Sequence, residues 1–342
     1  PREGALAGVA RVLAQNDSAC LYAAGTLKPA SRDRDGYDGR EESLARWSAA
    51  DGGGWAALHG PLVRTTPPSE ERQQAKEDAA SASTASGADD GEERDDPDED
   101  VYAVGGGTIE ALASIGNLLF VGGSFSLRRI DLESGEELAP RRYPRVRKTP
   151  EGDELIEIVE TAPKFLIAWD AALCAWHKVG ADQFQVDAPV SALAVDTNSG
   201  HLYVSGSFYW AGGAPSMGFA IYDTKASQWL MPPGARSRPV VDPLVQLLPV
   251  DGRLYARSKA GHVLQFDEDL PGLWKTLPEV PRPLRAASAL GWLPRALNAA
   301  EANQVGRLVV GGDFLQYGDL EDATTSGSVR GDWYGVATWD AA

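Results

Sequence analysis

The sequence is poor in the residues on which metal, redox and disulfide-stabilised proteins depend. It holds two cysteines, four histidines and two methionines in 342 residues. Cys20 and Cys174 are too few for a disulfide framework, and no Cys-x-x-Cys pair is present for a zinc or redox site. The histidines do not fall into a metal-binding or nucleophile motif. We therefore assign no catalytic residue, expect no metal and no cofactor, and expect a protein that is not an enzyme.

Basic residues are scarce relative to acidic ones. Lys and Arg number 32 and Asp and Glu number 49, which gives a formal net charge of −17. A surface of this sign repels nucleic acid and anionic membranes, so we expect no nucleic-acid partner. The sequence also has no run of about 18 apolar residues, so we expect no membrane span within it.

What the sequence has in abundance is a repeat of strand-length apolar segments. Its most regular element recurs five times, as CLYAAGTL (20–27), LLFVGGSF (118–125), LYVSGSF (202–208), RLYARSK (253–259) and RLVVGGDF (307–314). Runs of this length and composition between turn residues predict β-strands. Gly123, Gly206 and Gly312 stand near the end of three copies, where a bulky side chain would be tight or a positive φ is needed, and the first copy keeps Gly25.

Aromatic residues follow each copy at regular spacing. A third strand is expected around each of Trp47, Trp169, Tyr222, Phe266 and Trp339, and a fourth, outermost strand around Trp55, Trp176, Trp229 and Trp274. A four-stranded antiparallel sheet cannot bury both of its faces alone, so such sheets stack radially and pack aromatic side chains between them. The repeat therefore predicts an all-β fold, a β-propeller of four-stranded antiparallel blades, with five blade repeats visible and the last one incomplete.

The repeat also resembles a known family. A Gly pair after the second strand, an aromatic-Asp in the third and a Trp seven residues later resemble the kelch repeat of galactose-oxidase-type propellers. The pattern around Gly206, Phe208 and Ala211-Gly212-Gly213 is most similar to repeats of the fungal cortical polarity-marker propellers. The resemblance implies a cell-surface or extracellular assembly without catalysis. The fourth copy departs from the pattern, with Ala256-Arg257-Ser258 in place of Gly-Gly-Ser.

We expect one propeller over 1–342, with blades at about 5–60, 101–180, 188–232, 240–280 and 286–342. Because the fifth repeat lacks an outer strand, either the segment around 5–8 fills that place or further blades lie beyond Ala342, and we favour the second. Two insertions interrupt the blades. The segment at about 66–100 is rich in acidic residues and is expected to be disordered, and the segment at 139–164 is basic at its start. All long connections are expected on one face of the propeller, which makes that face the candidate binding surface. We expect these loops at 28–43, 61–100, 126–164, 209–218 and 315–334.

The candidate binding residues on this face are of two kinds. One is a basic run, and the other is a set of aromatic side chains that stack on sugar rings or anchor protein partners. They are Arg141, Arg142, Arg145, Arg147 and Lys148, and Tyr209, Trp210, Tyr317, Trp333 and Tyr334. The partner of the basic run is either the acidic insertion of the same chain or an external acidic protein or glycan.

Three functions fit these features. The first is a non-catalytic β-propeller that serves as a protein-interaction or structural scaffold module, in a cell-surface or extracellular assembly. The second is a glycan-binding or carbohydrate-active propeller. The third is an intracellular kelch-type adaptor. The sequence leaves the compartment undecided, although the resemblance favours an extracellular or cell-surface setting.

Overall fold

The computed structural model describes the chain in segments. These are residues 6–15, 20–29, 42–48, 54–63, 101–131, 136–139, 142–148, 154–160, 163–180, 185–231, 243–267, 274–277, 287–293, 306–316 and 333–340. Within them the chain forms strands, turns and bends, and no helix. The chain divides into two compact units, Pro1–Gln185 and Val186–Ala342. The fold is therefore all-β, as the repeat predicted.

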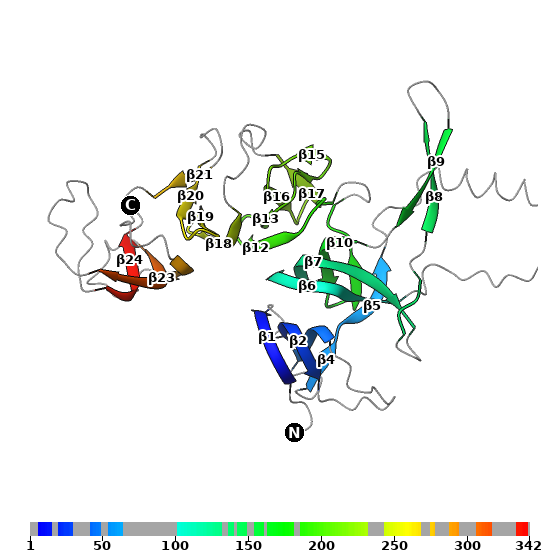
Figure 1. The fold of residues 1–342 in the computed structure, drawn as a ribbon, viewed down its shortest axis with the longest axis horizontal. Helices are drawn as coiled ribbons and strands as arrows, with labels where there is room; N and C mark the ends of the chain where they lie inside the picture. The colour runs from blue at the N-terminus through cyan, green and yellow to red at the C-terminus, as the bar shows by residue number, and fades with distance from the viewer. Residues whose placement is uncertain are drawn as a thin grey trace, which may run out of the picture. The chain divides into compact units, whose positions relative to one another are not determined.

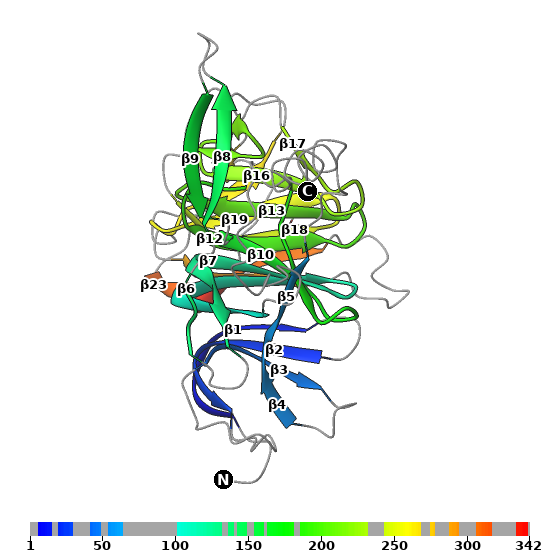
Figure 2. The same cartoon turned by 90° about the vertical axis from the view of Figure 1, so that its right-hand side faces the viewer.

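Most strands form antiparallel sheets in which chain neighbours are also spatial neighbours (Figures 1 and 2). The first unit begins with β1 (Leu6–Gln15), β2 (Cys20–Pro29), β3 (Glu42–Ser48) and β4 (Gly54–Ala57). The second unit contains β12 (Val190–Asp196), β13 (His201–Gly206), β16 (Phe219–Asp223) and β17 (Gln228–Leu230), then β18 (Leu244–Val250), β19 (Arg253–Ser258), β20 (Val263–Phe266) and β21 (Trp274–Thr276). Its last sheet has three described strands, β22 (Ala287–Leu293), β23 (Arg307–Gln316) and β24 (Trp333–Asp340).

The sheet that follows β4 differs from the expected four-stranded arrangement. It is a closed barrel in the order β10-β11-β5-β6-β7, built from β5 (His59–Val63), β6 (Val101–Ile115), β7 (Leu118–Ile130), β10 (Lys164–Asp170) and β11 (Ala175–His177). β5 pairs with β6 antiparallel and with β11 parallel, at Trp176↔Leu62. The expectation that Trp176 lies on an outermost strand is therefore wrong, because β11 has a neighbour on each side. The expectation that a loop begins at Pro61 is wrong as well.

Two short ribbons complete the described strands. β8 (Arg142–Lys148) and β9 (Glu154–Glu160) form a two-stranded antiparallel hairpin within the basic insertion (Figure 2). β14 (Trp210–Ala211) and β15 (Ala214–Pro215) form a smaller hairpin inside the connection from β13 to β16. That connection was expected to be a loop, and the structure instead gives it regular backbone pairing.

One irregularity recurs in all five pairs of first and second strands. In each pair, a single residue of the first strand is inserted without a partner in the second, which defines a β-bulge. The inserted residues are Arg11, Glu110, Ser191, Val245 and Ser288. The residues that pair just before the bulge are Gly25, Gly123, Gly206, Ser258 and Gly312, and those that pair just after it are Ala24, Gly122, Ser205, Arg257 and Gly311. The five sequence copies thus share one backbone register.

Close backbone approach explains the glycine at this position. A Cβ on Gly206 would collide with the carbonyl oxygen of Pro189 and lie 2.9 Å from the Cα of Val190. A Cβ on Gly123 would meet the corresponding atoms of Thr108 and Ile109. Both contacts are with backbone, which cannot move aside as a flexible side chain does. The glycines therefore allow the second strand to pass the bulge of the first.

The aromatic residues of the third and fourth strands pair directly across the sheet. The register joins Trp47 with Trp55, Trp169 with Trp176, Tyr222 with Trp229, and Phe266 with Trp274. Ring centroids lie 4.8, 5.2 and 5.4 Å apart in the last three pairs, with edge-to-face geometry. Cross-strand aromatic pairs stabilise antiparallel sheets, so the spacing of seven or eight residues reflects this pairing.

The Asp after the third-strand aromatic residue forms the turn that makes this pairing possible. The Asp170 carboxylate accepts hydrogen bonds from the backbone N–H groups of Ala172 and Leu173, at 2.8 and 3.2 Å. Asp223 accepts in the same way from Lys225 and Ala226, at 2.8 and 3.0 Å. The N–H of Ala226, followed by that of Lys225, lowers the pKa of the Asp223 carboxyl. The carboxylate of such an Asp stabilises a tight turn by accepting hydrogen bonds from backbone N–H groups two and three residues later. This explains the aromatic-Asp motif.

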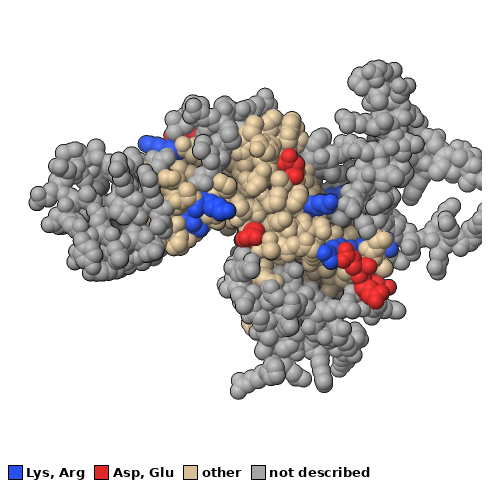
Figure 3. All heavy atoms as spheres, viewed as in Figure 1, with Lys and Arg blue, Asp and Glu red and all other residues tan. Residues whose placement is uncertain are grey.

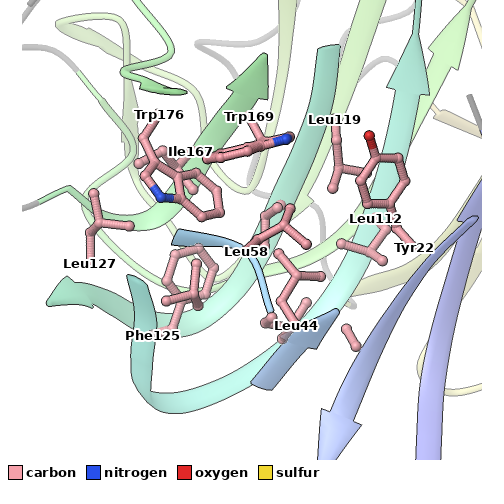
Figure 4. Close-up of a cluster of buried hydrophobic side chains, with 14 of the residues drawn as sticks. Tyr22, Leu44, Leu58, Leu112, Leu119, Phe125, Leu127, Ile167, Trp169 and Trp176 are labelled. Carbon is pink, nitrogen blue, oxygen red and sulfur yellow. The ribbon is translucent and has the colours of Figure 1, made fainter. Parts of the chain in front are cut away.

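Apolar clusters fill the space between successive sheets within each unit. In the first unit, side chains of β2, β3, β6, β7, β10 and β11 form one cluster that includes Tyr22, Leu44, Leu112, Trp169 and Trp176 (Figure 4). In the second unit, one cluster joins Ala192 and Phe219 to Leu247, and another joins Tyr255 to Leu290 and Leu308. Within each unit, successive sheets thus bury faces against one another, as the stacking argument predicted.

Candidate functional site

In the second unit, the first strands of the three sheets begin at the same end. Ser191 at the start of β12 donates its hydroxyl to the Leu244 carbonyl at the start of β18, at 2.6 Å. The amide of Gln246 in β18 both donates to the Leu290 carbonyl and accepts from the Leu290 N–H in β22, each at 2.8 Å. We call this the strand-start end. The β13–β16 and β19–β20 connections leave the sheets there, because β13 and β19 run antiparallel to β12 and β18.

The strand-start end of the first of these sheets presents two adjacent aromatic side chains to solvent. Tyr209 is 61% exposed and Trp210 is 50% exposed, although both are large apolar residues. They lie in the β13–β16 connection, between Phe208 and Ala211, which are buried. Tyr and Trp are over-represented among the residues that dominate binding energies at protein interfaces. The pair is therefore the best-defined candidate binding feature among the described residues.

A single carboxylate fixes the backbone of this pair. Oδ1 of Asp187 accepts hydrogen bonds from the backbone N–H of Tyr209, at 2.9 Å, and of Trp210, at 3.0 Å. The carbonyl of Tyr209 in turn accepts from the N–H of Ser216 at 2.8 Å, which closes the small β14–β15 hairpin. Sequence reasoning did not find Asp187, because its partners lie more than twenty residues later in the chain.

The β14–β15 turn rests on one of the repeat tryptophans. Gly212 has φ +61°, and a Cβ at this position would collide with the side chain of Trp229. Trp229 is half-buried and packs edge-to-face on Tyr222. The aromatic pair is thus held by a rigid loop, which reduces the entropy lost when a partner orders it.

The other aromatic candidates lie partly outside the described residues. Tyr317 is not among the described residues. Trp333 and Tyr334 are in β24, where the register places them opposite Gln316 and Leu315. These two residues end β23 and lie beyond Gly312. This is again the strand-start end, because Gly312 pairs with Ala287 at the beginning of β22. The backbone therefore brings Trp333 and Tyr334 to the same end as Tyr209 and Trp210.

The basic run lies in the first unit, in β8, apart from Arg141, which is outside the described residues. Its register is informative. Arg142 lies opposite Glu160, Arg145 opposite Glu157, and Lys148 opposite Glu154, while Arg147 lies opposite Leu155. Opposite charges at facing positions of an antiparallel pair attract each other. Three of the four described bases thus have an acidic residue of the same hairpin at the facing register position.

Across the described segments, no group of three or more His, Cys, Asp or Glu side chains could hold a metal ion. The described part of the chain likewise contains no helix long and apolar enough to cross a membrane. On the face drawn in Figure 3, the described basic and acidic side chains gather in several small groups.

Comparison with known proteins identifies no family. No protein-family model and no curated protein sequence matches the chain. Among solved structures, the β-propeller domain of Myceliophteria_thermophila Cps50 (Swd1) is 13% identical over 51% of this chain and 50% of that chain, with a TM-score of 0.29. Sqt1 of Saccharomyces cerevisiae is 14% identical over 57% and 52%, with a TM-score of 0.32.

A third match is PorZ, described as an essential bacterial surface component of the type-IX secretion system of Porphyromonas gingivalis. It is 12% identical over 62% of this chain and 26% of that chain, with a TM-score of 0.31. The chain thus spans about half the length of the first two structures and about a quarter of the third. TM-scores this low do not establish that the chain shares the fold or the function of these proteins.

Proposed function

We propose that the chain is a non-catalytic β-propeller that serves as a protein-interaction scaffold. In this proposal the five repeats form one ring, and the strand-start end is its binding face. It is supported by the shared register and bulge of the five strand pairs and by the apolar clusters between successive sheets. Repeat proteins of this kind present loops on a rigid scaffold, and binding residues concentrate on such loops.

The observation that carries the proposal is the exposed Tyr209–Trp210 pair on a loop fixed by Asp187. Burying an exposed aromatic ring at an interface removes a large apolar area from water, and this lowers the free energy of the complex. Exposed aromatic side chains therefore serve as interface anchors. Burying both rings on a preorganised loop supplies affinity without a large ordering cost. No reacting group is needed for this role.

The experiment compares three forms of the full chain as bait in an extract of the cells that make the protein. They are the wild type, Trp210→Ala, and Leu173→Ala. Leu173 is a matched control because it is 63% exposed and lies in a turn of the first unit, outside the β13–β16 connection. We expect Trp210→Ala to reduce recovery of a specific partner at least about tenfold, and Leu173→Ala to leave it unchanged.

Equal recovery by Trp210→Ala and the wild type would contradict the binding face. Loss with Leu173→Ala alone would move the binding site to the first unit. Each variant first has to show the circular dichroism spectrum and the unfolding temperature of the wild type. Only then is the amount of partner that it recovers compared.

The same aromatic pair supports the glycan-binding alternative, because tyrosine and tryptophan rings also stack on the apolar faces of sugars. A glycan array probed with the wild type and Trp210→Ala separates the two. Glycan binding that Trp210→Ala abolishes favours the sugar, and protein recovery without glycan binding favours the scaffold. The kelch-type adaptor, the cell-surface setting and an acidic partner for the basic run remain predictions from the sequence.

A further inference from the structure

Arg257 departs from the repeat at a position where the other sheets hold a small residue. The register just after the bulge is occupied by Ala24, Gly122, Ser205 and Gly311 in the other four strand pairs. In β19 the same position is Arg257, paired with Gln246. The fold evidently does not require a long side chain there. A charged residue at such a position needs a reason of its own.

Among the described residues, no acidic side chain pairs with Arg257. Nη1 donates one hydrogen bond to the Ala287 carbonyl at 3.3 Å, which links β19 to β22. Nε is buried and has no hydrogen-bond partner. Burial lowers the pKa of the guanidinium, and no carboxylate of the described residues acts against this effect. A buried N–H donor without an acceptor is costly, so hydrogen bonding within the fold does not explain an arginine at this position.

Two further basic side chains, one lysine and one histidine, lie at the same end of this sheet. Lys259 and His262 lie in the turn between β19 and β20, and both are exposed. The turn is fixed, because Lys259 donates its N–H to the Pro243 carbonyl at 2.8 Å and His262 donates its N–H to Ser258 Oγ at 3.1 Å. Lys259 sits two residues after Arg257.

The described acidic residues of the same sheet lie at its opposite end. Asp251 is in the turn between β18 and β19, and Asp267 follows the last residue of β20. Since β18 and β20 both begin at the strand-start end, Asp251 and Asp267 are a full strand length from Arg257. Among the described residues, the strand-start end of the β18–β21 sheet is therefore basic in a chain whose net charge is −17.

We propose that Arg257, with Lys259 and His262, forms a binding site for an oxyanion, the carboxylate or phosphate group of a ligand. A guanidinium presents its N–H donors in a planar fork that matches the oxygens of either group, and such charge-assisted hydrogen bonds are strong. The site goes beyond the scaffold function, and it stands on residues that the aromatic loop does not contain.

The test measures binding of two probes to the full chain by titration calorimetry at low salt. Inorganic phosphate represents a free anion, and hexaglutamate represents an acidic protein segment. The variants are Arg257→Ser and Arg253→Ser. Arg257→Ser installs the residue found at this register in the neighbouring sheet, Ser205, so the fold is expected to accept it. Arg253→Ser makes the same charge change at the other end of the same strand.

We expect the wild type and Arg253→Ser to bind at least one probe, and Arg257→Ser to bind it at least about tenfold more weakly. Binding of hexaglutamate with no binding of phosphate identifies an acidic segment as the ligand, and binding of phosphate alone identifies a free anion. If the wild type binds neither probe, or if Arg257→Ser binds as tightly as the wild type, the proposal is wrong. Arg257 then serves only to link β19 to β22.

Should Arg257→Ser lower the unfolding temperature, Arg257→Gln takes its place in the comparison. Glutamine keeps an N–H donor for the Ala287 carbonyl and removes the charge. Weaker probe binding by a stably folded Arg257→Gln supports the site, and unchanged binding overturns it. A negative result for Trp210→Ala in the capture experiment leaves these outcomes unaffected, because that variant does not alter Arg257.

Discussion

The two best-described repeat tryptophans occupy environments that differ in one testable respect. Trp176 is fully buried, and its indole N–H donates to the Tyr102 carbonyl at 3.0 Å. Trp229 is half-buried, and its indole nitrogen is buried without a hydrogen-bond partner. The sequence pattern treats the two as equivalent. The structure predicts that they respond differently to the same substitution.

Replacement by phenylalanine isolates the hydrogen bond. In Trp176→Phe the chain loses the bond to Tyr102 and part of a fully buried ring, so we expect a cost of about 1–3 kcal/mol. In Trp229→Phe no hydrogen bond is lost and a buried unpaired N–H is removed, so we expect less than about 1 kcal/mol. Replacement by alanine is expected to cost about 3–5 kcal/mol at Trp176 and about half of that at Trp229, which is only half-buried.

The measurement is urea unfolding followed by far-UV circular dichroism, because the tryptophan signal itself changes in these variants. The free energy of unfolding is compared for the wild type and the four variants. An equal cost for Trp176→Phe and Trp229→Phe would refute the reasoning, since it would mean that the hydrogen bond to Tyr102 contributes nothing. A larger cost at Trp229 would show that burial is assigned to the wrong tryptophan.

Three further outcomes are expected. Gly206→Ala should destabilise the chain by about 1–3 kcal/mol because its Cβ collides with the Pro189 carbonyl, whereas Gly291→Ala, whose Cβ would lie 3.9 Å from the nearest atom, should be nearly neutral in the same urea assay. Burial lowers the pKa of His177, so the unfolded state binds its proton more tightly; stability should fall as pH drops below about 6.5, and His177→Gln should reduce that loss in melting curves. Glu157→Gln should strengthen heparin binding by the β8–β9 hairpin and Arg145→Ser should weaken it, both effects fading near 0.5 M salt as the Debye length shortens to about 4 Å; no change in either variant would exclude the hairpin from binding.

Local patterns predicted the sheets of the second unit closely. The strand expected at 202–208 is β13, His201–Gly206, and the one expected around Tyr222 is β16, Phe219–Asp223. These strands are short, alternate with turn residues and pair with their chain neighbours, so each one is specified by its own few residues. The pairing of Tyr222 with Trp229 across β16 and β17 is also determined locally, because the length of the turn between the two strands sets their register.

The barrel of the first unit escaped prediction for the opposite reason. β5 has only five residues and contains Pro61, which reads as a break in a strand pattern. Its parallel partner, β11, lies more than a hundred residues later, so no local signal marks the pairing. The same distance problem hid Asp187, whose hydrogen bonds define the loop of the aromatic pair.

The repeat therefore separates two kinds of residue. Where a position keeps its repeat identity, as Gly123 and Gly206 do beside the bulge, the structure supplies the same packing reason in both copies. At Arg257 one copy departs, and packing supplies no such reason. Its register holds alanine, serine or glycine elsewhere, and its Nε has no partner. The Ala256-Arg257-Ser258 segment stands out in the sequence, but only the register and the burial of Nε distinguish Arg257 from an ordinary surface arginine.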